Sequence, residues 1–470
     1  MVNKEKSKEI RVRMAPSPTG NLHIGTVRTT LFNWLFARHH QATFIMRIED
    51  TDRDRSKPEF EQNILEGLEW LGLSWDEFYR QSERVEIHKK YLTRLLEEKK
   101  AFWCYHTVEE LEVEKEEQMK NKEAPRHICD HKYTIPEGRE RQIIRLAVDE
   151  KADRAISFND LIRGPIEFEG RTIGDLSLAK DEDTPLYNFA VVVDDVEMRI
   201  SHVIRGEDHI NNTPKQILIA EALGAVAPQF AHLPLILGSD RSKLSKRHGA
   251  TMFDEYIQAG YLPAALINFL ALLGWTPEGD QEVLSVEEII SKFELEKVHK
   301  SGAIFDNKKL NWISVQHLKK LSDEELAEKL MPFIEKHFGT QDKNLILKVV
   351  PSARERLEYL DQIKEFHYFF KKPEYDSELL VWKKSDKTGA KKALEEVQKI
   401  LTDLGDEWGE ATLKAELDKL AQEQFGGDRG AVYWPLRVAL TGEKFSPDPI
   451  SIVSVLTKEE VLNRISKAIR

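Results

Sequence analysis

The sequence contains very little cysteine. Only Cys104 and Cys129 occur among its 470 residues. Small secreted proteins that lack a large core depend on many disulfides, so this composition excludes that class. A chain of this length can instead bury hydrophobic cores in several domains.

Long apolar runs are also missing. No run in the sequence approaches the ~20 apolar residues that a helix needs to cross a bilayer. Residues 1–9 are polar and charged, so they lack the apolar centre of a signal peptide. We therefore expect a cytoplasmic protein with no membrane partner.

The chain has no overall excess of positive charge. Its formal net charge is −12 at pH 7, which disfavours a protein that coats nucleic acid without specificity. An RNA partner remains compatible with this value, because phosphate binding depends on local basic patches rather than on total charge.

The first 95 residues alternate strand and helix patterns. Residues 10–14 alternate apolar and arginine side chains, which predicts a strand, and the prolines and glycine of 16–20 predict a loop. Helical spacing of apolar residues over 27–38 predicts a helix with one buried face. A second strand at 43–48 and a second helix at 64–71 follow. This order predicts a parallel sheet with crossover helices.

A similar alternation returns after residue 189. Residues 190–193, 202–204 and 235–237 have strand patterns, and 217–223 have a helix pattern. The segment between the two halves differs, because a Lys/Glu-rich helix pattern is followed there by short strand-like stretches. These patterns predict an α/β, doubly wound, Rossmann-like domain with a second unit inserted into it.

The predicted chain has four parts. Residues 1–95 and 190–245 form the two halves of the Rossmann-like domain, and residues 96–189 are the insertion. Residues 246–325 form a helical region, and residues 326–470 an all-α C-terminal domain. Apolar residues at helical spacing over 393–401 support this last prediction, as do Thr457 and Glu460, which have the spacing of a capping box.

A His-x-Gly motif lies where the first predicted loop meets the first predicted helix. His23 and Gly25 are its ends, and Thr26 follows. A helix N-terminus has unpaired N–H groups and a positive dipole end, both of which suit phosphate. Gly25 lets a nucleotide approach the backbone closely, and His23 can donate hydrogen bonds to phosphate oxygens. Taken alone, the same residues are also typical of ordinary capping and turns.

A basic motif follows the strand predicted at 235–237. Lys243 and Lys246 lie three residues apart in a polar loop, and this spacing suits a cationic clamp for a polyphosphate. The alternative is a solvated surface loop, in which most charge runs occur. Because open α/β sheets bind ligands at the carboxyl ends of their strands, both motifs can face one crevice.

Together the two motifs resemble the HIGH-type and KMSKS-type signatures of class I aminoacyl-tRNA synthetases, although Thr26, Leu244 and Arg247 replace three of the name-giving residues. The surrounding sequence is similar to bacterial-type glutamyl-tRNA synthetases. The segments that carry this similarity are 13–20 (RMAPSPTG), 47–52 (RIEDTD), 192–195 (VVDD), 203–208 (VIRGED) and 435–442 (PLRVALTG). They span nearly the whole chain.

The resemblance implies an enzyme that attaches glutamate to tRNA. ATP, which brings Mg²⁺, activates glutamate as glutamyl-adenylate, and the 3′ end of tRNA-Glu then accepts the glutamyl group. In this family the insertion binds the acceptor end, the region 246–325 contacts the tRNA stem, and the C-terminal domain binds the anticodon. We expect a monomer. The residues leave open whether tRNA-Gln is also a substrate and whether activation requires bound tRNA.

The resemblance also assigns site residues. His23, Lys243 and Lys246 would act on the triphosphate during catalysis, and Ser17 and Gly25 would complete the ATP site.

For the glutamate pocket, the resemblance implies Arg13, Ser17, Glu49, Tyr187 and Arg205. The two arginines would bind carboxylates in bidentate fashion, which lysine cannot copy. Glu49 would pair with the ammonium group, and the hydroxyl groups would add hydrogen bonds. Without the resemblance, Arg13, Glu49 and Arg205 would be interpreted as members of structural ion pairs at strand ends.

The two cysteines form a C-x-H…C-x-H pattern in the insertion, with Cys104, His106, Cys129 and His131. Four such ligands suit tetrahedral structural Zn²⁺. Some glutamyl enzymes carry zinc here with Cys-x-Cys as the first pair, whereas this chain has His106 at the second position. The alternative is two buried thiols and exposed histidines, with His127 in a polar loop.

Other functions fit the sequence less well. A glutaminyl enzyme shares the catalytic fold, but its anticodon region is built of β-barrels. A shortened paralogue that modifies tRNA lacks a C-terminal domain. A nucleotidylyltransferase for a small metabolite would not need the Lys motif together with a helical C-terminal domain. A non-catalytic regulatory derivative should have lost His23, Gly25 or Lys246.

Overall fold

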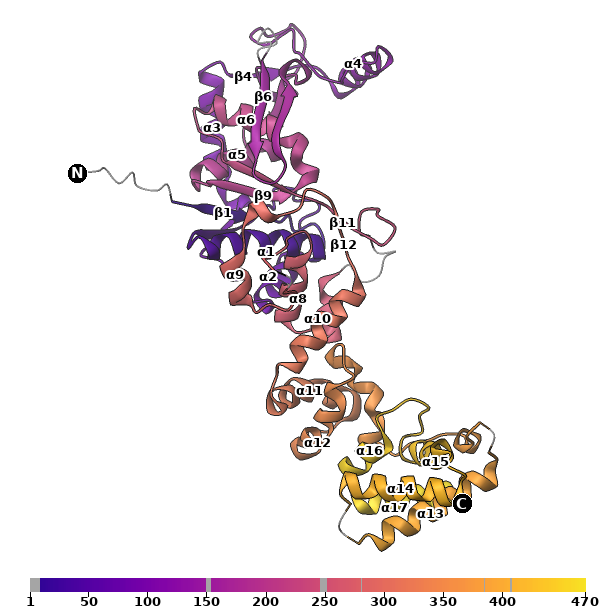
Figure 1. The fold of residues 1–470 in the computed structure, drawn as a ribbon. Coiled ribbons are helices and arrows are strands. Elements are labelled where there is room, and N and C mark those ends of the chain that lie inside the picture. Colours follow the sequence, from indigo (N-terminus) through magenta and orange to yellow (C-terminus); the bar gives the residue numbers. More distant parts are fainter. Residues whose placement is uncertain (1–8, 149–153, 246–251, 280, 384, 406–407) are drawn as a thin grey trace, which may run out of the picture. The chain divides into compact units, whose positions relative to one another are not determined.

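The computed structural model describes residues 9–148, 154–245, 252–279, 281–383, 385–405 and 408–470 (Figure 1). The chain divides into two compact units. The first consists of Met1–Ile257 and Pro263–Leu310, and the second of Gln258–Leu262 and Asn311–Arg470. Within the described ranges, every helix is too short or too polar to cross a membrane.

A seven-stranded sheet lies at the centre of the first unit. Its strands are β1 (Arg11–Met14), β2 (Thr43–Ile48), β3 (Glu77–Arg80), β6 (Ala155–Asp160), β7 (Gly164–Glu169), β9 (His202–Gly206) and β10 (Gln229–Leu233). Their order across the sheet is β3-β2-β1-β9-β10-β6-β7. All neighbouring pairs are parallel except β6 with β7. The chain runs outward from β1 to β3 and restarts at β9 on the other side of β1, which confirms the predicted doubly wound fold.

Helices cover both faces of this sheet. They are α1 (Ile24–His39), α2 (Pro58–Trp70), α3 (Val85–Glu97), α5 (Tyr187–Glu197), α6 (Thr213–Ala222), α7 (Phe253–Ala259), α8 (Pro263–Leu272) and α9 (Val286–Lys292). Figure 1 shows α1, α8 and α9 on one side of β1 and β9, and α3, α5 and α6 on the other. The helix predicted over 27–38 is α1. Its burial extends round to Arg28, Thr30 and Asn33, because α8 and α9 cover the side that faces away from the sheet.

One strand prediction in the second half was wrong. Residues 190–193 belong to α5, and every side chain from Phe189 to Asp195 is buried. A short apolar run without period is compatible with a buried helix as well as with a strand. Residues 235–237 do contain a strand, β11 (Ile236–Leu237), but it pairs with β12 (Ala303–Ile304) outside the main sheet. The strand that enters the sheet there is β10, which the sequence patterns did not predict.

The inserted segment contributes to two sheets. Strands β4 (Ala101–Cys104), β5 (Ile143–Leu146) and β8 (Leu176–Ala179) form an antiparallel sheet of their own. The predicted Lys/Glu-rich helix is α4 (Val108–Lys120), and a capping box between Thr107 and Glu110 fixes its start. The other two strands, β6 and β7, join the main sheet beside β10. The exact domain boundaries given above remain predictions.

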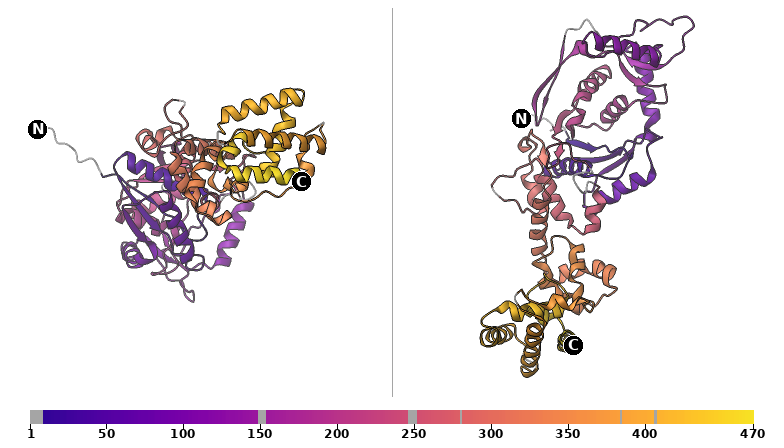
Figure 2. Two further views of the ribbon diagram at one scale, coloured as in Figure 1. Left: turned by 90° about the horizontal axis from the view of Figure 1, so that it is seen from below. Right: turned by 90° about the vertical axis from the view of Figure 1, so that its right-hand side faces the viewer.

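The second unit consists of helices in its described residues, as both views of Figure 2 show in orange and yellow. Its α-helices, of which the first begins in the first unit, are α10 (Asn307–Lys319), α11 (Asp323–Phe338), α12 (Lys343–Arg354), α13 (Lys387–Asp403), α14 (Glu410–Gln424), α15 (Arg429–Thr441), α16 (Pro449–Val455) and α17 (Lys458–Ile469). The apolar stripe predicted at 393–401 is buried on α13. Thr457 caps α17 by accepting the Glu460 N–H, whereas the Glu460 carboxylate binds Arg464.

Candidate active site

A cavity of about 740 Å³ opens in the first unit where the strand order reverses, at the carboxyl ends of β1, β2 and β9. Open α/β sheets bind ligands at this position. The structure brings eight of the predicted site residues to its wall: Arg13, Ser17, His23, Gly25, Glu49, Tyr187, Arg205 and Lys243. Lys246 lies outside the described residues.

His23 is the N-cap residue of α1, so the start of this helix faces the cavity. Its Nδ1 accepts the Thr26 N–H at 3.3 Å, and its Nε2 lies 3.0 Å from Thr26 Oγ1. A Cβ atom at Gly25 would stand 3.0 Å from the His23 ring, so glycine leaves the ring its place. Partial removal from water and the charge of Lys243 lower the pKa of His23 below 6.5. This shift favours the neutral ring.

Lys243 reaches the same cavity from the segment after β11. A bridge to Leu237 and a hydrogen bond from the Leu244 N–H to the Ile236 carbonyl, 2.9 Å long, hold its backbone. Lys243 is exposed and close enough to His23 to affect its pKa. A helix N-terminus, an imidazole and a lysine thus line one end of the cavity, a combination that suits a polyphosphate.

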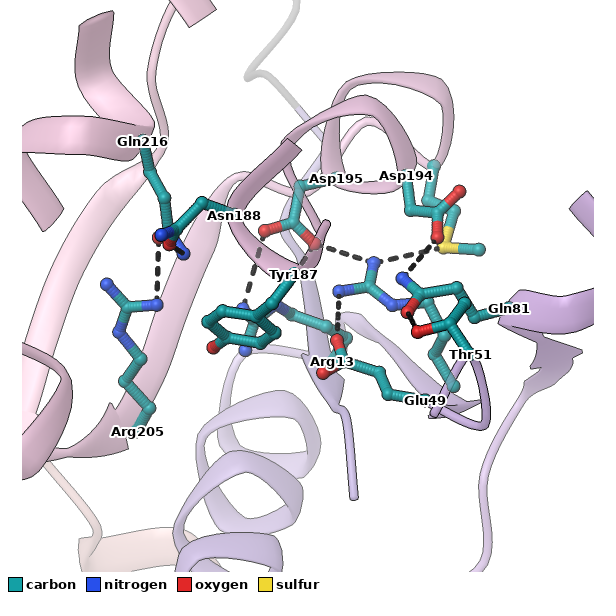
Figure 3. A network of polar contacts seen from close by, with 12 residues as sticks. Arg13, Glu49, Thr51, Gln81, Tyr187, Asn188, Asp194, Asp195, Arg205 and Gln216 are labelled. Carbon is teal, nitrogen blue, oxygen red and sulfur yellow. Dashed lines mark hydrogen bonds and ion pairs between the residues drawn. The ribbon is translucent and has the colours of Figure 1, made fainter. Parts of the chain in front are cut away.

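A buried network of charges forms the floor at the ends of β1 and β2 (Figure 3). Arg47 is completely buried, and its two Nη atoms lie 2.7 Å from Asp195 Oδ1 and 3.1 Å from Glu49 Oε1. Arg13 Nε lies 3.2 Å from the same Asp195 oxygen. Despite burial, Arg13 and Arg47 hold the pKa of Asp195 below its ordinary value. For Glu49 burial outweighs both arginines and raises the pKa.

The neighbouring Asp194 belongs to a second cluster. Its carboxylate accepts hydrogen bonds from Arg84 at 2.6 Å and Gln81 at 2.8 Å, and lies 3.0 Å from His88 Nε2. Although burial opposes ionisation, His88 and Arg47 lower the pKa of Asp194 to about 2. Two adjacent residues of α5 thus bind arginines from three different elements, which fixes α5 against β1 and β2.

Arg205, at the end of β9, has a different environment. Its guanidinium donates to His232 Nε2 at 3.2 Å, Gln216 Oε1 at 2.8 Å and Thr213 Oγ1 at 2.8 Å. All three acceptors are neutral, and no carboxylate of the described chain forms an ion pair with Arg205. Burial lowers its pKa to about 10, so it remains charged at pH 7. A buried cation without a counter-ion is costly, so this end of the cavity favours an anionic ligand.

Polar residues complete the wall near Arg205. The Tyr187 hydroxyl lies 3.2 Å from His209 Nδ1, and burial together with Glu49 raises the pKa of Tyr187 to about 12. Arg205, Glu49 and Tyr187 therefore offer a cation, a carboxylate and a hydroxyl group. This set matches the carboxylates and the ammonium group of an acidic amino acid.

Sequence reasoning gave no role to Arg47, Asp195, His209 or His232. A detectable signal existed for Arg47, because an arginine at an inward position of the apolar strand TFIMRI must have buried partners. Asp195 and His232 have their partners in distant parts of the chain. His209 contacts the nearby Asn212 as well as Tyr187, and no spacing pattern marks either contact.

A separate group of metal-binding side chains lies in the insertion. Cys104, His106, His127 and Cys129 have ligand atoms within 4.8 Å of one another. Three of the four are the predicted residues. His127 takes the place predicted for His131, which instead lies with His106 and Asp130. The backbone of His127 packs against Gly174, where a Cβ would come within 2.3 Å of the His127 carbonyl oxygen. The His127 ring lies 3.5 Å from Cys104 Sγ.

The dimensions of this group fit tetrahedral zinc. Zinc binds thiolate sulfur at about 2.3 Å and imidazole nitrogen at about 2.0 Å, so sulfur and nitrogen ligands of a tetrahedral site lie about 3.5 Å apart. The distances from Cys104 Sγ are 3.6 Å to His106 Nδ1 and 3.5 Å to His127 Nε2, and that from Cys129 Sγ to His106 Nδ1 is 3.7 Å. The other nitrogen of His127 lies 2.6 Å from a Glu114 carboxylate oxygen, which orients the ring as around many metal sites.

The Arg47 network predicts a large stability effect. Arg47→Met should lower the free energy of unfolding by about 3–5 kcal/mol, because it leaves Glu49 and Asp195 buried with one cation fewer. Arg55→Met is the control, since Arg55 is exposed and pairs with the half-exposed Asp52, so the change there should be within about 0.5 kcal/mol. Urea unfolding followed by tryptophan fluorescence measures both. Equal effects would show that the network contributes no more than a surface pair.

Comparison with family models agrees with this site. Residues 9–312 match the model "tRNA synthetases class I (E and Q), catalytic domain", and residues 325–469 match the model "Anticodon binding domain".

Individual proteins match over almost their whole length. The chain is 44% identical to glutamate–tRNA ligase 1 of Thermoanaerobacter sp. (strain X514) over 98% of this chain and 99% of the relative. It is 43% identical to glutamate–tRNA ligase of Carboxydothermus hydrogenoformans, over 97% and 99%. A crystal structure of a glutamate tRNA ligase from Elizabethkingia meningosepticum, in complex with its amino acid, superposes with a TM-score of 0.84 at 33% identity, covering 98% and 99%. The chain belongs to the class I tRNA synthetases for glutamate and glutamine, among the bacterial glutamate–tRNA ligases.

Proposed function

We propose that this chain activates glutamate with ATP and transfers it to the 3′ end of tRNA-Glu. The observation that carries the proposal is Arg205, a buried cation in the cavity whose protein partners are all neutral. A ligand that brings its own carboxylate to this position completes the charge balance. Full-length relatives that are glutamate–tRNA ligases support the same function.

The nucleotide would bind at the end of the cavity near His23. The N–H groups at the start of α1 and the side chain of Lys243 face it, and Gly25 lets it approach the helix. Lys246 and Ser17 complete the proposed ATP site, and ATP brings Mg²⁺, which neutralises charge on the phosphate oxygens. The protein provides positioning and charge stabilisation as the glutamate carboxylate attacks the α-phosphorus. The lowered pKa of His23 favours the neutral ring, which can donate one hydrogen bond as phosphate charge develops.

Glutamate would occupy the other end. Arg205 would bind one of its carboxylates, and Glu49 would accept the ammonium group. The charge of Arg13 is already balanced by Asp195, so Arg13 would contribute orientation and hydrogen bonds rather than an unpaired charge. Tyr187 and Ser17 would donate hydroxyl contacts. Glutamine should be rejected strongly, because its amide would leave a buried guanidinium without a counter-ion.

Further parts of the proposal concern the tRNA. The insertion would bind the acceptor end, and the helices of the second unit would bind the anticodon. We propose that the enzyme acts as a monomer. Discrimination between tRNA-Glu and tRNA-Gln depends on contacts that the fold alone does not define.

In the insertion, we propose that Cys104, His106, His127 and Cys129 hold Zn²⁺. The metal would supply structural cross-links between β4 and the loop after α4, so that the loop keeps one conformation. Although burial opposes ionisation, hydrogen bonds with His127 and His106 lower the pKa of the Cys104 thiol to about 6, which favours the thiolate that zinc binds.

Charging of purified tRNA tests the function. With ATP, Mg²⁺ and labelled glutamate, the protein should charge tRNA-Glu, and a parallel reaction with tRNA-Gln distinguishes a strict enzyme from a relaxed one. Labelled glutamine should not be transferred to either tRNA. Folded protein that charges neither tRNA with glutamate would overturn the proposal and favour a non-catalytic tRNA-binding role.

The Lys motif should act on the nucleotide. Lys246→Ala and Lys243→Ala are each expected to slow adenylate formation by roughly ten- to a thousandfold, because each removes a cation that stabilises transition-state charge. The KM for glutamate should change less than threefold. Pyrophosphate exchange in the presence of tRNA measures both quantities. Parallel losses of rate and glutamate affinity would contradict this role. Lys89→Ala is the control, because this lysine of α3 pairs with the exposed Asp183 and does not line the cavity.

Metal content tests the zinc site. Mass spectrometry of the native protein should find about one zinc per chain. His127→Ala should lose the metal and melt at a lower temperature, because a structural site couples metal binding to folding. His131→Ala is the matched control and should retain zinc. Retention of zinc by His127→Ala together with its loss from His131→Ala would restore the ligand set predicted from the sequence.

A further inference from the structure

His232 lies behind Arg205, on the neighbouring strand of the main sheet. In the register of β9 with β10, Arg205 and His232 are direct partners. Both side chains are buried, with His232 completely inaccessible to solvent. His232 Nε2 lies 3.2 Å from Arg205 Nε and 3.1 Å from Thr213 Oγ1. An N–H of arginine can only donate, so Nε2 must be unprotonated to accept it.

Asp160, on the next strand, determines which nitrogen of His232 carries the proton. One of its carboxylate oxygens lies 2.6 Å from His232 Nδ1 and accepts the His232 backbone N–H at 3.0 Å. Its other oxygen accepts the backbone N–H groups of Ile162 and Arg163 at 3.0 and 2.8 Å. The carboxylate therefore cannot rotate away. A carboxylate beside Nδ1 selects the tautomer with the proton on Nδ1, which leaves Nε2 as an acceptor.

We propose that Asp160 and His232 are positioning residues that hold the Arg205 guanidinium in its glutamate-binding orientation. The proposal rests on the proposed role of Arg205 toward glutamate. Asp160 fixes the tautomer of His232, His232 accepts the Nε–H of Arg205, and Thr213 and Gln216 accept from the two Nη atoms. His232, Thr213 and Gln216, which accept these hydrogen bonds from the guanidinium, are all neutral. They therefore orient Arg205 without competing with the substrate carboxylate for its charge.

An anionic support would act differently. Arg13, on the wall of the same cavity, shows the alternative, because the Asp195 carboxylate balances its charge directly. With His232 between them, the charge of Asp160 stays one ring away from Arg205. In many enzymes a carboxylate binds one nitrogen of a histidine and so orients its ring for catalysis or for metal binding. Here the same kind of pair would orient a substrate-binding arginine.

Two substitutions at His232 separate the functions of its ring nitrogens. In His232→Gln the amide oxygen reaches the position of Nε2 and can still accept from Arg205. In His232→Asn the shorter amide reaches only the position of Nδ1, so it can bind Asp160 but cannot accept from Arg205. We expect His232→Asn to raise the KM for glutamate roughly ten- to a hundredfold, since a hydrogen bond to a charged group is lost. His232→Gln should restore it to within about threefold.

The measurement is tRNA charging by the full-length enzyme, with KM values for glutamate and ATP determined separately. The ATP value should not change in either variant. His202→Asn, the same replacement at the other end of β9, is the control. Equal glutamate KM values for His232→Asn and His232→Gln would overturn the proposal, as would a parallel rise in the ATP KM, which would indicate a general structural role.

Two more variants complete the experiment. If His232→Asn does not fold, Asp160→Asn decides, because an amide can stabilise the other tautomer and should raise the glutamate KM as well. An unchanged value there would contradict the proposal. Arg205→Lys tests the underlying site: an unchanged glutamate KM in this variant means that the assignment of Arg205 itself fails. A rise in Arg205→Lys without any effect in folded His232→Asn means that only the positioning role fails.

Discussion

The buried guanidinium of Arg47 determines how the catalytic sheet and its helices fit together. It lies at the end of β2, and it binds a carboxylate from its own strand end and one from α5. Removal of a charge from water costs several kcal/mol, so such a group is tolerated only where its partners are fixed. The fixed partners are Glu49 and Asp195, and Asp195 in turn holds Arg13. The position of the proposed amino-acid pocket thus follows from one buried ion network.

The cationic groups on the cavity wall differ in how their charges are balanced. Arg13 forms an ion pair with a protein carboxylate, whereas Arg205 donates hydrogen bonds only to neutral groups. Near His23 the cationic groups are more exposed, and they belong to a helix start and a surface segment. This gradient suits two ligands of different kinds. A compact amino acid needs a rigid, desolvated pocket, whereas a polyphosphate with its metal ion needs access from solvent.

Sequence reasoning predicted the doubly wound sheet, the helical C-terminal unit and the residues that line the cavity. It succeeded where the signal was local, as in the alternation of residues 10–14 or the His-x-Gly at the start of α1. It was wrong for residues 190–193, because an apolar run that is buried on all sides has no period to identify it. It predicted His131 as a metal ligand, whereas the fold brings His127 to Cys104, His106 and Cys129, because sequence spacing does not show which histidine lies nearest. The contact between Asp160 and His232, which are 72 residues apart, could not be predicted from any local pattern and is known only from the structure.

The insertion is not an independent module for protein engineering, because it contributes strand β6 to the main sheet. Segments inserted into a catalytic domain are often treated as exchangeable modules, to be swapped between relatives in order to change substrate preference. Here the insertion supplies β6, whose last residue lies beside β10 and contacts His232. A chimera cut at the sequence boundaries of the insertion would replace part of the main sheet together with the module. Grafts that keep β6 and β7 from the host, and exchange only the segment that contains β4, α4 and β5, would leave the sheet intact.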